Sequence, residues 1–356
     1  MGRSKITPIV QALLAAILFG ASAPLSKTLL GEVEPIPLAA FLYLGSGFGM
    51  LGITLVQRIT QRSIIKEAKI QKPDIPWLAG AILAGGVAAP ITLLFSLKST
   101  PAATASLLLN FESVATTLIA AWFFKEAISR RAWLAIVLIT FSTILLSVNL
   151  DTAWGFSLGA FGIIAACFFW GIDNNFTRNI SAKDPTTIVT IKGLVAGSVS
   201  LILALFIGNQ IPSVGIILGA MLLGSLSYGT SIVLFIHAMR GLGAGRTSAL
   251  FSTAPLSGLL LSFILFRENP GWLFLAAFPL MAAGTLFLAT EAHNHLHTHD
   301  SVSHEHAHVH DDGHHEHEHD SGNSTRHSHL HTHEALTHDH HHMPDTHHRH
   351  DHTVQS

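Results

Sequence analysis

Cysteine and charge are both scarce in this chain of 356 residues. Its one cysteine, Cys167, excludes an intramolecular disulfide and any metal site built on several thiolates. Charged residues make up 12% of the chain and hydrophobic residues 49%, which is more apolar than a water-soluble core requires. The sequence contains no phosphate-binding loop, nucleophile triad or basic nucleic-acid surface. It therefore predicts neither an enzyme nor a nucleic-acid-binding protein.

Long apolar stretches fill the first four fifths of the chain instead. Each is roughly 20 residues long, the length that crosses a bilayer as a helix. They lie near residues 8–30, 36–57, 76–97, 102–124, 131–149, 154–177, 186–208, 213–236, 244–266 and 272–290. Backbone polar groups in hydrocarbon must bond within the protein, and the connecting segments are short. We therefore expect an all-α integral membrane protein with ten transmembrane helices.

The two halves of this apolar region repeat each other. Residues 102–126 match residues 244–268 at an offset of 142, and the first span matches the sixth at an offset of 151. Because each half holds an odd number of spans, the second half enters the membrane inverted. We expect inverted five-helix repeats at 8–149 and 154–290. Two related halves are typical of a solute carrier, whose site lies between them near the bilayer midplane.

Lys and Arg collect at alternate ends of the spans and predict the orientation. Five basic residues lie between the second and third spans, and Lys125, Arg130 and Arg131 follow the fourth. The opposite loops carry acidic residues such as Glu32 and Glu34. We therefore expect a multi-pass protein of the cytoplasmic (inner or plasma) membrane, surrounded by the lipid bilayer, with both termini in the cytoplasm.

Ten spans in two inverted halves, with closing stretches Ala-Ala-Trp-Phe-Phe-Lys-Glu (120–126) and Ser-Phe-Ile-Leu-Phe-Arg-Glu (262–268), resemble the EamA family of the drug/metabolite transporter superfamily. The resemblance covers residues 8–290. It implies a permease for small organic solutes, often an exporter, with no ATP site and no required cofactor. It does not name the substrate, because one fold hosts many specificities.

Two features of the closing stretches bear on this resemblance. Glu126 and Glu268 stand where each half of the family ends its fourth helix with a Glu, and at a loop boundary they favour capping over transport. Lys125 and Arg267 replace the family's common Gly before that Glu. Residues 110–113 also replace an apolar segment that usually contains Pro.

Polar and ionisable side chains inside the spans are the candidate substrate-binding residues, because each one is costly in a bilayer. Glu112 lies mid-span, where an unpaired carboxylate favours a functional role. A polar stripe at helical spacing follows the fourth span and recurs on the ninth. The candidates are Ser106, Asn110, Glu112, Ser113, Asp173, Asn174, Lys192, His237, Ser248 and Ser252.

Structural roles stand beside these functional ones. Asp173, Asn110 and Asn174 are able to hydrogen-bond across a helix interface. Lys192 either snorkels towards the membrane surface or pairs with Asp173. His237 closes the eighth span, where an interfacial role is favoured over a titrating gate.

The composition changes completely at residue 291. From His293 to His352 the chain holds 24 of its 25 histidines, interleaved with acidic and hydroxyl residues, so we expect residues 291–356 to be a disordered tail. Repeated His-X-His units favour binding of Ni, Zn, Co or Cu ions. The expected ligands are His293, His295, His297, His299, His304, His306, His308, His310, His314, His315, His317, His319, His327, His329, His331, His333, His338, His340, His341 and His342.

Three functions follow from these features. The favoured one is a secondary transporter of a small organic metabolite. Its cytosolic tail would bind transition metal and regulate the transport. The second is a transition-metal (Ni, Co or Zn) cation carrier, which is disfavoured because His237 is the one imidazole within the spans. The third is a membrane-anchored metal buffer or sensor, which Glu112 and the polar stripe disfavour. The sequence leaves the substrate, the direction, the coupling ion and the oligomeric state open.

Overall fold

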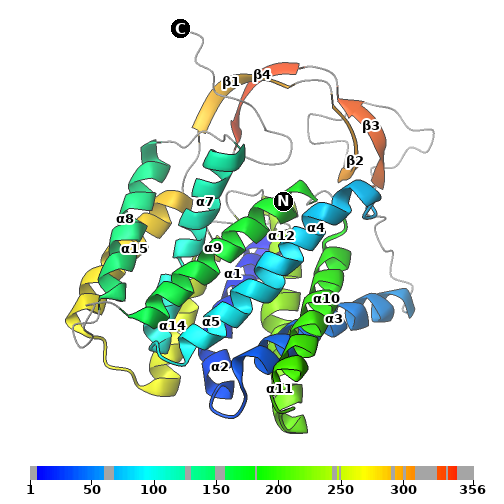
Figure 1. The fold of residues 1–356 in the computed structure, drawn as a ribbon. Coiled ribbons are helices and arrows are strands. Elements are labelled where there is room, and N and C mark those ends of the chain that lie inside the picture. Colours follow the sequence, from blue (N-terminus) through cyan, green and yellow to red (C-terminus); the bar gives the residue numbers. More distant parts are fainter. Residues whose placement is uncertain are drawn as a thin grey trace.

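The computed structural model describes residues 6–59, 68–124, 130–148, 157–180, 183–242, 247 and 250–289, together with tail segments 293–299, 302–308, 327–333 and 336–342. Within the described part of residues 6–289 the regular elements are helices, and they pack side by side in one bundle (Figure 1). The prediction of an all-α membrane protein is confirmed.

Several spans are built from more than one helical segment. The elements of the bundle, in which η1 is a 3-10 helix and η2 and η3 are π-helices, are α1 (Ile6–Gly20), α2 (Ser22–Leu29), α3 (Pro35–Ile59), η1 (Lys72–Asp74), α4 (Ile75–Ala81), η2 (Ile82–Ala88), α5 (Ala89–Leu97), α6 (Ala102–Leu108), α7 (Phe111–Phe124), α8 (Arg130–Ser147), α9 (Leu158–Asn179), α10 (Pro185–Ile207), α11 (Val214–Gly224), η3 (Ser225–Thr230), α12 (Ser231–Leu242), α14 (Ala254–Phe266) and α15 (Trp272–Ala289). In Figure 1 the N-terminus lies at one end of the bundle, whereas α2 and α11 lie at the other.

The ten expected spans correspond to three kinds of helix. Ala254–Phe266 and Trp272–Phe287 are apolar but shorter than a full span within the described residues. The helix α9 is long enough, with 22 residues, but it contains the polar run Asp173, Asn174 and Asn175 and is less apolar than the other spans. Seven helices of the described part are long and apolar enough to cross a membrane: Thr7–Leu29, Pro35–Val56, Lys72–Leu97, Ala102–Phe123, Arg130–Ser147, Pro185–Ile207 and Val214–Ala238.

Glycine brings α3 against helices of the second half. A Cβ on Gly47 would lie 2.7 Å from Leu194 N on α10, and a Cβ on Gly45 would lie 2.1 Å from Met221 O on α11. Lipid supplies little hydrophobic drive for helix association, so such close backbone packing is what holds membrane helices together. The second and seventh spans therefore meet directly.

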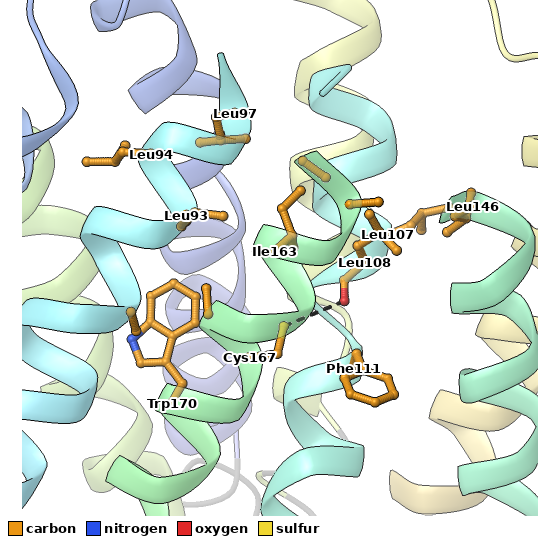
Figure 2. Packing of buried hydrophobic residues seen from close by; sticks show 14 of the residues in the cluster. Leu93, Leu94, Leu97, Leu107, Leu108, Phe111, Leu146, Ile163, Cys167 and Trp170 are labelled. Atoms are coloured by element: carbon orange, nitrogen blue, oxygen red, sulfur yellow. Dashed lines mark hydrogen bonds between the residues drawn. The ribbon is translucent and has the colours of Figure 1, made fainter. Parts of the chain in front are cut away.

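The buried core lies around α5, α6 and α9. Figure 2 shows leucines of α5 and α6 packed around Ile163, with Cys167 one turn further along α9. The Cys167 thiol is buried and donates to Leu108 O at 3.7 Å. On the outside, Trp122 is 85% exposed and Phe206 89% exposed, as expected of side chains that face lipid rather than a core.

The fourth and ninth spans are interrupted at corresponding points. α6 ends at Leu108 and α7 begins at Phe111, while turn residues Ser252 and Thr253 precede α14. At the repeat offset of 142, Asn110 corresponds to Ser252. The same offset carries η2 (Ile82–Ala88) onto 224–230, where η3 lies. Broken helices in corresponding positions of two halves are the usual surroundings of a carrier's binding site, and π-helices are frequent at functional sites.

Four short strands lie in the tail. β1 (His293–His299) pairs antiparallel with β4 (Leu336–His342), and β2 (Val302–His308) pairs antiparallel with β3 (His327–His333). The sequence predicts disorder from composition alone, whereas these segments form two ribbons because His-X-His alternates with the two-residue period of a strand. A lone two-stranded ribbon is marginally stable in water. That the tail packs no core stays a prediction.

Candidate functional site

Glu112 lies in the first turn of α7, directly after the break in the fourth span. Its Oε1 accepts a hydrogen bond of 2.8 Å from Asn174 Nδ2 on α9, and the same nitrogen donates to Thr116 Oγ1 at 3.1 Å. The N-terminal end of a helix favours negative charge. Among the described residues, the ion pairs do not include Glu112, so its carboxylate is held by an amide and by the start of the helix.

Asp173 and Lys192 form a buried ion pair between α9 and α10. Lys192 Nζ donates to Asp173 Oδ2, and Thr177 Oγ1 donates to Oδ1 at 2.9 Å. The lysine and aspartate side chains are 17% and 5% exposed. Separating them would leave a charge without compensation in a low-dielectric surrounding. Of the two structural roles expected for Lys192, snorkelling and pairing, the structure shows pairing with Asp173.

Gly85 in the π-helix η2 lies directly against this ion pair. A Cβ at Gly85 would lie 1.9 Å from Asp173 Oδ2, so only glycine fits here without a shift. The Gly85 carbonyl oxygen accepts hydrogen bonds from Tyr43 Oη at 2.6 Å and from Trp170 Nε1 at 3.1 Å. Four elements, α3, η2, α9 and α10, therefore converge at one point inside the bundle.

The second π-helix reaches the same point through Tyr228. The rings of Tyr43 and Tyr228 are stacked, with centroids 5.6 Å apart and an interplanar angle of 22°, and Phe19 meets Tyr228 edge-on at 6.1 Å. These are the chain's two tyrosines. Sequence reasoning missed Tyr43, Trp170 and Tyr228. Two signals could have found them. Tyrosine is scarce in this chain, so each tyrosine places a rare polar ring in an apolar bundle. Gly85 lacks a side chain, which allows a neighbouring helix to approach its backbone closely.

Asn175 and Gly171 hold α9 close to α7. Asn175 Nδ2 donates to Thr116 O at 3.1 Å and to Gly171 O at 2.8 Å. A Cβ at Gly171 would lie 3.0 Å from Thr116 N. This close contact brings Asn174, the residue before Asn175 on α9, within reach of Glu112.

Ser106 and Asn110 are engaged in packing around the helix break. Ser106 Oγ donates to Ala102 O at 2.9 Å, and a Cβ on Gly258 of α14 would lie 2.9 Å from that Oγ. Asn110 Nδ2 donates to Leu107 O at 3.2 Å, and its Oδ1 accepts from Thr285 Oγ1 on α15 at 3.3 Å. The contacts of both side chains join the fourth span to the last two spans.

The remaining candidates are scattered. Ser113 is exposed on α7, His237 is exposed on α12, and Ser252 is partly buried in the turn before α14. Ser248 lies outside the described residues. Of the expected tail ligands, those at positions 293–299, 302–308, 327–333 and 336–342 lie on β1 to β4, and those outside the described residues are His310, His314, His315, His317 and His319. In the part of the chain that the structure describes, no group of three or more His, Cys, Asp or Glu side chains is placed to hold a metal ion.

Glu268 caps α6, which confirms the capping role expected for it. Its Oε1 accepts from Ala102 N at 2.7 Å and its Oε2 from Ala103 N at 2.8 Å. The preceding residue, Arg267, has φ 49° and ψ 37°, in the left-handed region that favours glycine. The corresponding Glu126 lies outside the described residues.

Two corresponding broken spans, two corresponding π-helices and polar groups of both halves meeting inside an apolar bundle define a membrane transporter built from related halves. A family model described as the EamA-like transporter family matches the chain twice, at residues 6–148 and 157–290. The chain therefore belongs to that family and consists of two related halves. The chain is therefore a secondary transporter and not an enzyme, and transporters of this family need no cofactor.

One similar protein agrees with this assignment, and one solved structure shares the fold. An uncharacterized transporter of Methanothermobacter thermautotrophicus is 32% identical over an alignment of 279 residues, which covers 73% of this chain and 79% of that protein. A crystal structure of a protein aligns with a TM-score of 0.57 at 18% identity, covering 81% of this chain and 98% of the other. At that identity the second likeness shows the fold alone.

Proposed function

We propose that this protein carries a small organic metabolite across the cytoplasmic membrane and binds it beside Glu112. The observation that carries the proposal is the hydrogen bond between Glu112 in the first half and Asn174 in the second half. A contact of this kind joins the two halves beside a broken helix, where carriers bind their substrates. Motion of one half against the other would therefore break or remake it.

The charges of the cluster indicate which solutes it favours. Asp173 and Lys192 neutralise each other, so Glu112 is the carboxyl of the group that is left to meet a solute. The stacked and buried rings of Tyr43 and Tyr228 add aromatic side chains to the same group. A solute with a protonated amine or another hydrogen-bond donor and an apolar body matches this combination.

The topology in this proposal has inverted halves at 8–149 and 154–290 and both termini in the cytoplasm. Its support is the corresponding breaks in the fourth and ninth spans, the corresponding positions of η2 and η3, and the asymmetry of Lys and Arg between the loops. The cytoplasmic end would then be the end of the bundle that holds the N-terminus in Figure 1.

The tail, residues 291–356, is proposed as a cytosolic transition-metal-binding segment that modulates transport. Its support is the strand register, which sets histidines opposite one another on alternate positions, the positions that share one face of a strand. Directly opposite residues have Cβ atoms about 4.5–5.5 Å apart, a spacing from which two imidazoles reach one metal ion. The opposed pairs are His293 with His342, His295 with His340, His297 with His338, His304 with His331, His306 with His329, and His308 with His327.

Transport in proteoliposomes tests this function. The full chain and a chain lacking residues 293–356 are reconstituted, and uptake and efflux of a panel of metabolites are measured with and without Ni²⁺ or Zn²⁺. We expect both proteins to move an organic solute, and metal to change the rate in the full chain only. Accumulation of the metal ion itself by the shortened chain would overturn the proposal in favour of the cation carrier.

A further inference from the structure

The Glu268 carboxylate joins the two halves of the protein at one end of the bundle. Each of its oxygens accepts one backbone N–H of the first turn of α6, although 166 and 165 residues separate Glu268 from Ala102 and Ala103. The N-cap position of α6 is Pro101, whose side chain makes no capping hydrogen bond. The first turn of α6 therefore takes its cap from the other half of the protein. We call this pair of hydrogen bonds the Glu268 clasp.

Neighbouring contacts close the same end. Arg267 N bonds to Phe263 O at 3.1 Å, and the left-handed turn at Arg267 brings the chain from the last turn of α14 to Glu268. Lys27 of α2 donates to Thr100 O and lies 5.7 Å from the centre of the Phe266 ring. The first span, the loop before the fourth span and the end of the ninth span are thus tied together around the clasp.

Near the clasp, Gly258 packs α14 tightly against both α1 and α6. A Cβ on Gly258 of α14 would lie 2.5 Å from Gly20 O on α1 and 2.9 Å from Ser106 Oγ on α6. Ser106 is 2% exposed. No solute passes between α6 and α14 while this packing and the clasp are both in place, so the structure is closed between these two helices.

A carrier whose site lies between its halves has to open each end in turn. Opening at this end separates α6 from α14 and so releases the clasp. Glu268 is only partly buried, so water is able to replace the two N–H groups when the helices part. We propose that Glu268 is the gating residue of this end, which holds the carrier closed here by its two charge-assisted hydrogen bonds. The proposal rests on the transport function above.

Cysteine labelling tests the gate without knowledge of the substrate. In a Cys167→Ala background of the full chain, reconstituted in proteoliposomes, one reporter is Ser106→Cys below the clasp and the other is Ser113→Cys, exposed beyond the break in the fourth span. Labelling by a membrane-impermeant maleimide is followed with Glu268 intact and with Glu268→Gln. Gln keeps the shape, but its amide oxygen accepts while its NH₂ opposes the second N–H.

We expect Glu268→Gln to raise the labelling rate at position 106 about tenfold and to lower it at position 113, because opening one end of an alternating carrier closes the other. The matched control is Glu34→Gln at the same end, whose carboxylate pairs with Lys98 at 3.2 Å and is 56% exposed. This control should leave both rates unchanged.

Two results would overturn the gate. Unchanged labelling at position 106 would make Glu268 a permanent cap, and faster labelling at both positions would mean general loosening of the fold. If Glu268→Gln fails to fold, Glu268→Asp, which keeps the charge but is shorter, takes its place with the same two readouts. These outcomes do not depend on the identity of the solute, so failure of the gate is distinguishable from failure of the transport proposal.

Discussion

The substitution Gly85→Ala tests whether the centre of the bundle is built as described. The added Cβ would lie 1.9 Å from Asp173 Oδ2, 2.3 Å from its Cγ and 2.5 Å from its Cβ. Ordinary contact begins at 3.4 Å, so the carboxylate oxygen has to retreat by about 1.5 Å (3.4 − 1.9) or η2 has to move. Either shift strains the pair with Lys192 and the two hydrogen bonds at the Gly85 carbonyl.

The expected loss of stability follows from these contacts. Overpacking a tight site costs about 1–3 kcal/mol, and breaking a buried ion pair by removing one partner costs about 3–5 kcal/mol. Because Lys192 is able to follow a displaced Asp173 in part, we expect a loss of roughly 3 kcal/mol, between these two limits. Thermal unfolding of the purified protein in detergent, followed by circular dichroism at one fixed scan rate, measures the change in Tm.

Gly52→Ala is the matched control. A Cβ at Gly52 of α3 meets nothing within 4 Å, and alanine is favoured over glycine inside a helix by about 1 kcal/mol. The control should therefore unfold at the wild-type Tm or above it, and Gly85→Ala well below it. If Gly85→Ala were as stable as Gly52→Ala, the close approach of η2 to Asp173 would be refuted.

Three further predictions concern other parts of the chain. Arg267→Gly should raise Tm, because a side chain in the left-handed region costs about 1–2 kcal/mol, and a fall in Tm would argue against that turn. Reporter fusions at residue 292 and in the 149–153 loop should lie on opposite sides of the membrane, and the same side would end the inverted topology. Deleting residues 293–356 should leave folding and insertion intact but remove most Ni²⁺ or Zn²⁺ binding in a calorimetric titration. The full chain should also lose metal below about pH 6, because imidazoles with an ordinary pKa of about 6.5 ligate only when neutral, so pH-independent binding would assign the metal to other ligands.

The bundle was predictable because its causes are local. Apolar length sets the spans, and the 142-residue offset pairs the fourth span with the ninth. The capping role of Glu268 was predictable as well, because a carboxylate at a loop boundary is well placed to cap a helix. The sequence did not show that the capped helix belongs to the other half.

The centre of the site was only partly predictable, because it depends on where four elements cross. The sequence pointed to Glu112, Asp173 and Lys192 by the cost of charge in a bilayer, and it offered pairing as one role of Lys192. It did not reveal the π-helices, because the π-helical hydrogen-bond pattern of η2 and η3 has no residue signature of its own. Tyr43 and Trp170 meet at Gly85 only in three dimensions.

The tail shows a different limit. Composition led to a prediction of disorder, while the alternation of histidine with other residues equally matches the period of a strand. In these residues the composition thus indicates disorder, whereas the alternation of histidine indicates strands. Which segments pair was not predictable from the sequence, because the His-X-His units repeat at several places.

Substrate transport by Glu112→Gln tests the central claim most directly. The solute identified with the wild-type protein is supplied to proteoliposomes that hold the wild type, Glu112→Gln or the control Glu34→Gln, and initial rates are measured at equal amounts of folded protein. Glu112 accepts a hydrogen bond from Asn174 of the other half. Gln in its place keeps the shape of the side chain but removes the carboxylate. We predict transport that is abolished or at least tenfold slower in Glu112→Gln and unchanged in Glu34→Gln. Wild-type rates in Glu112→Gln would contradict the account and leave Glu112 a structural residue.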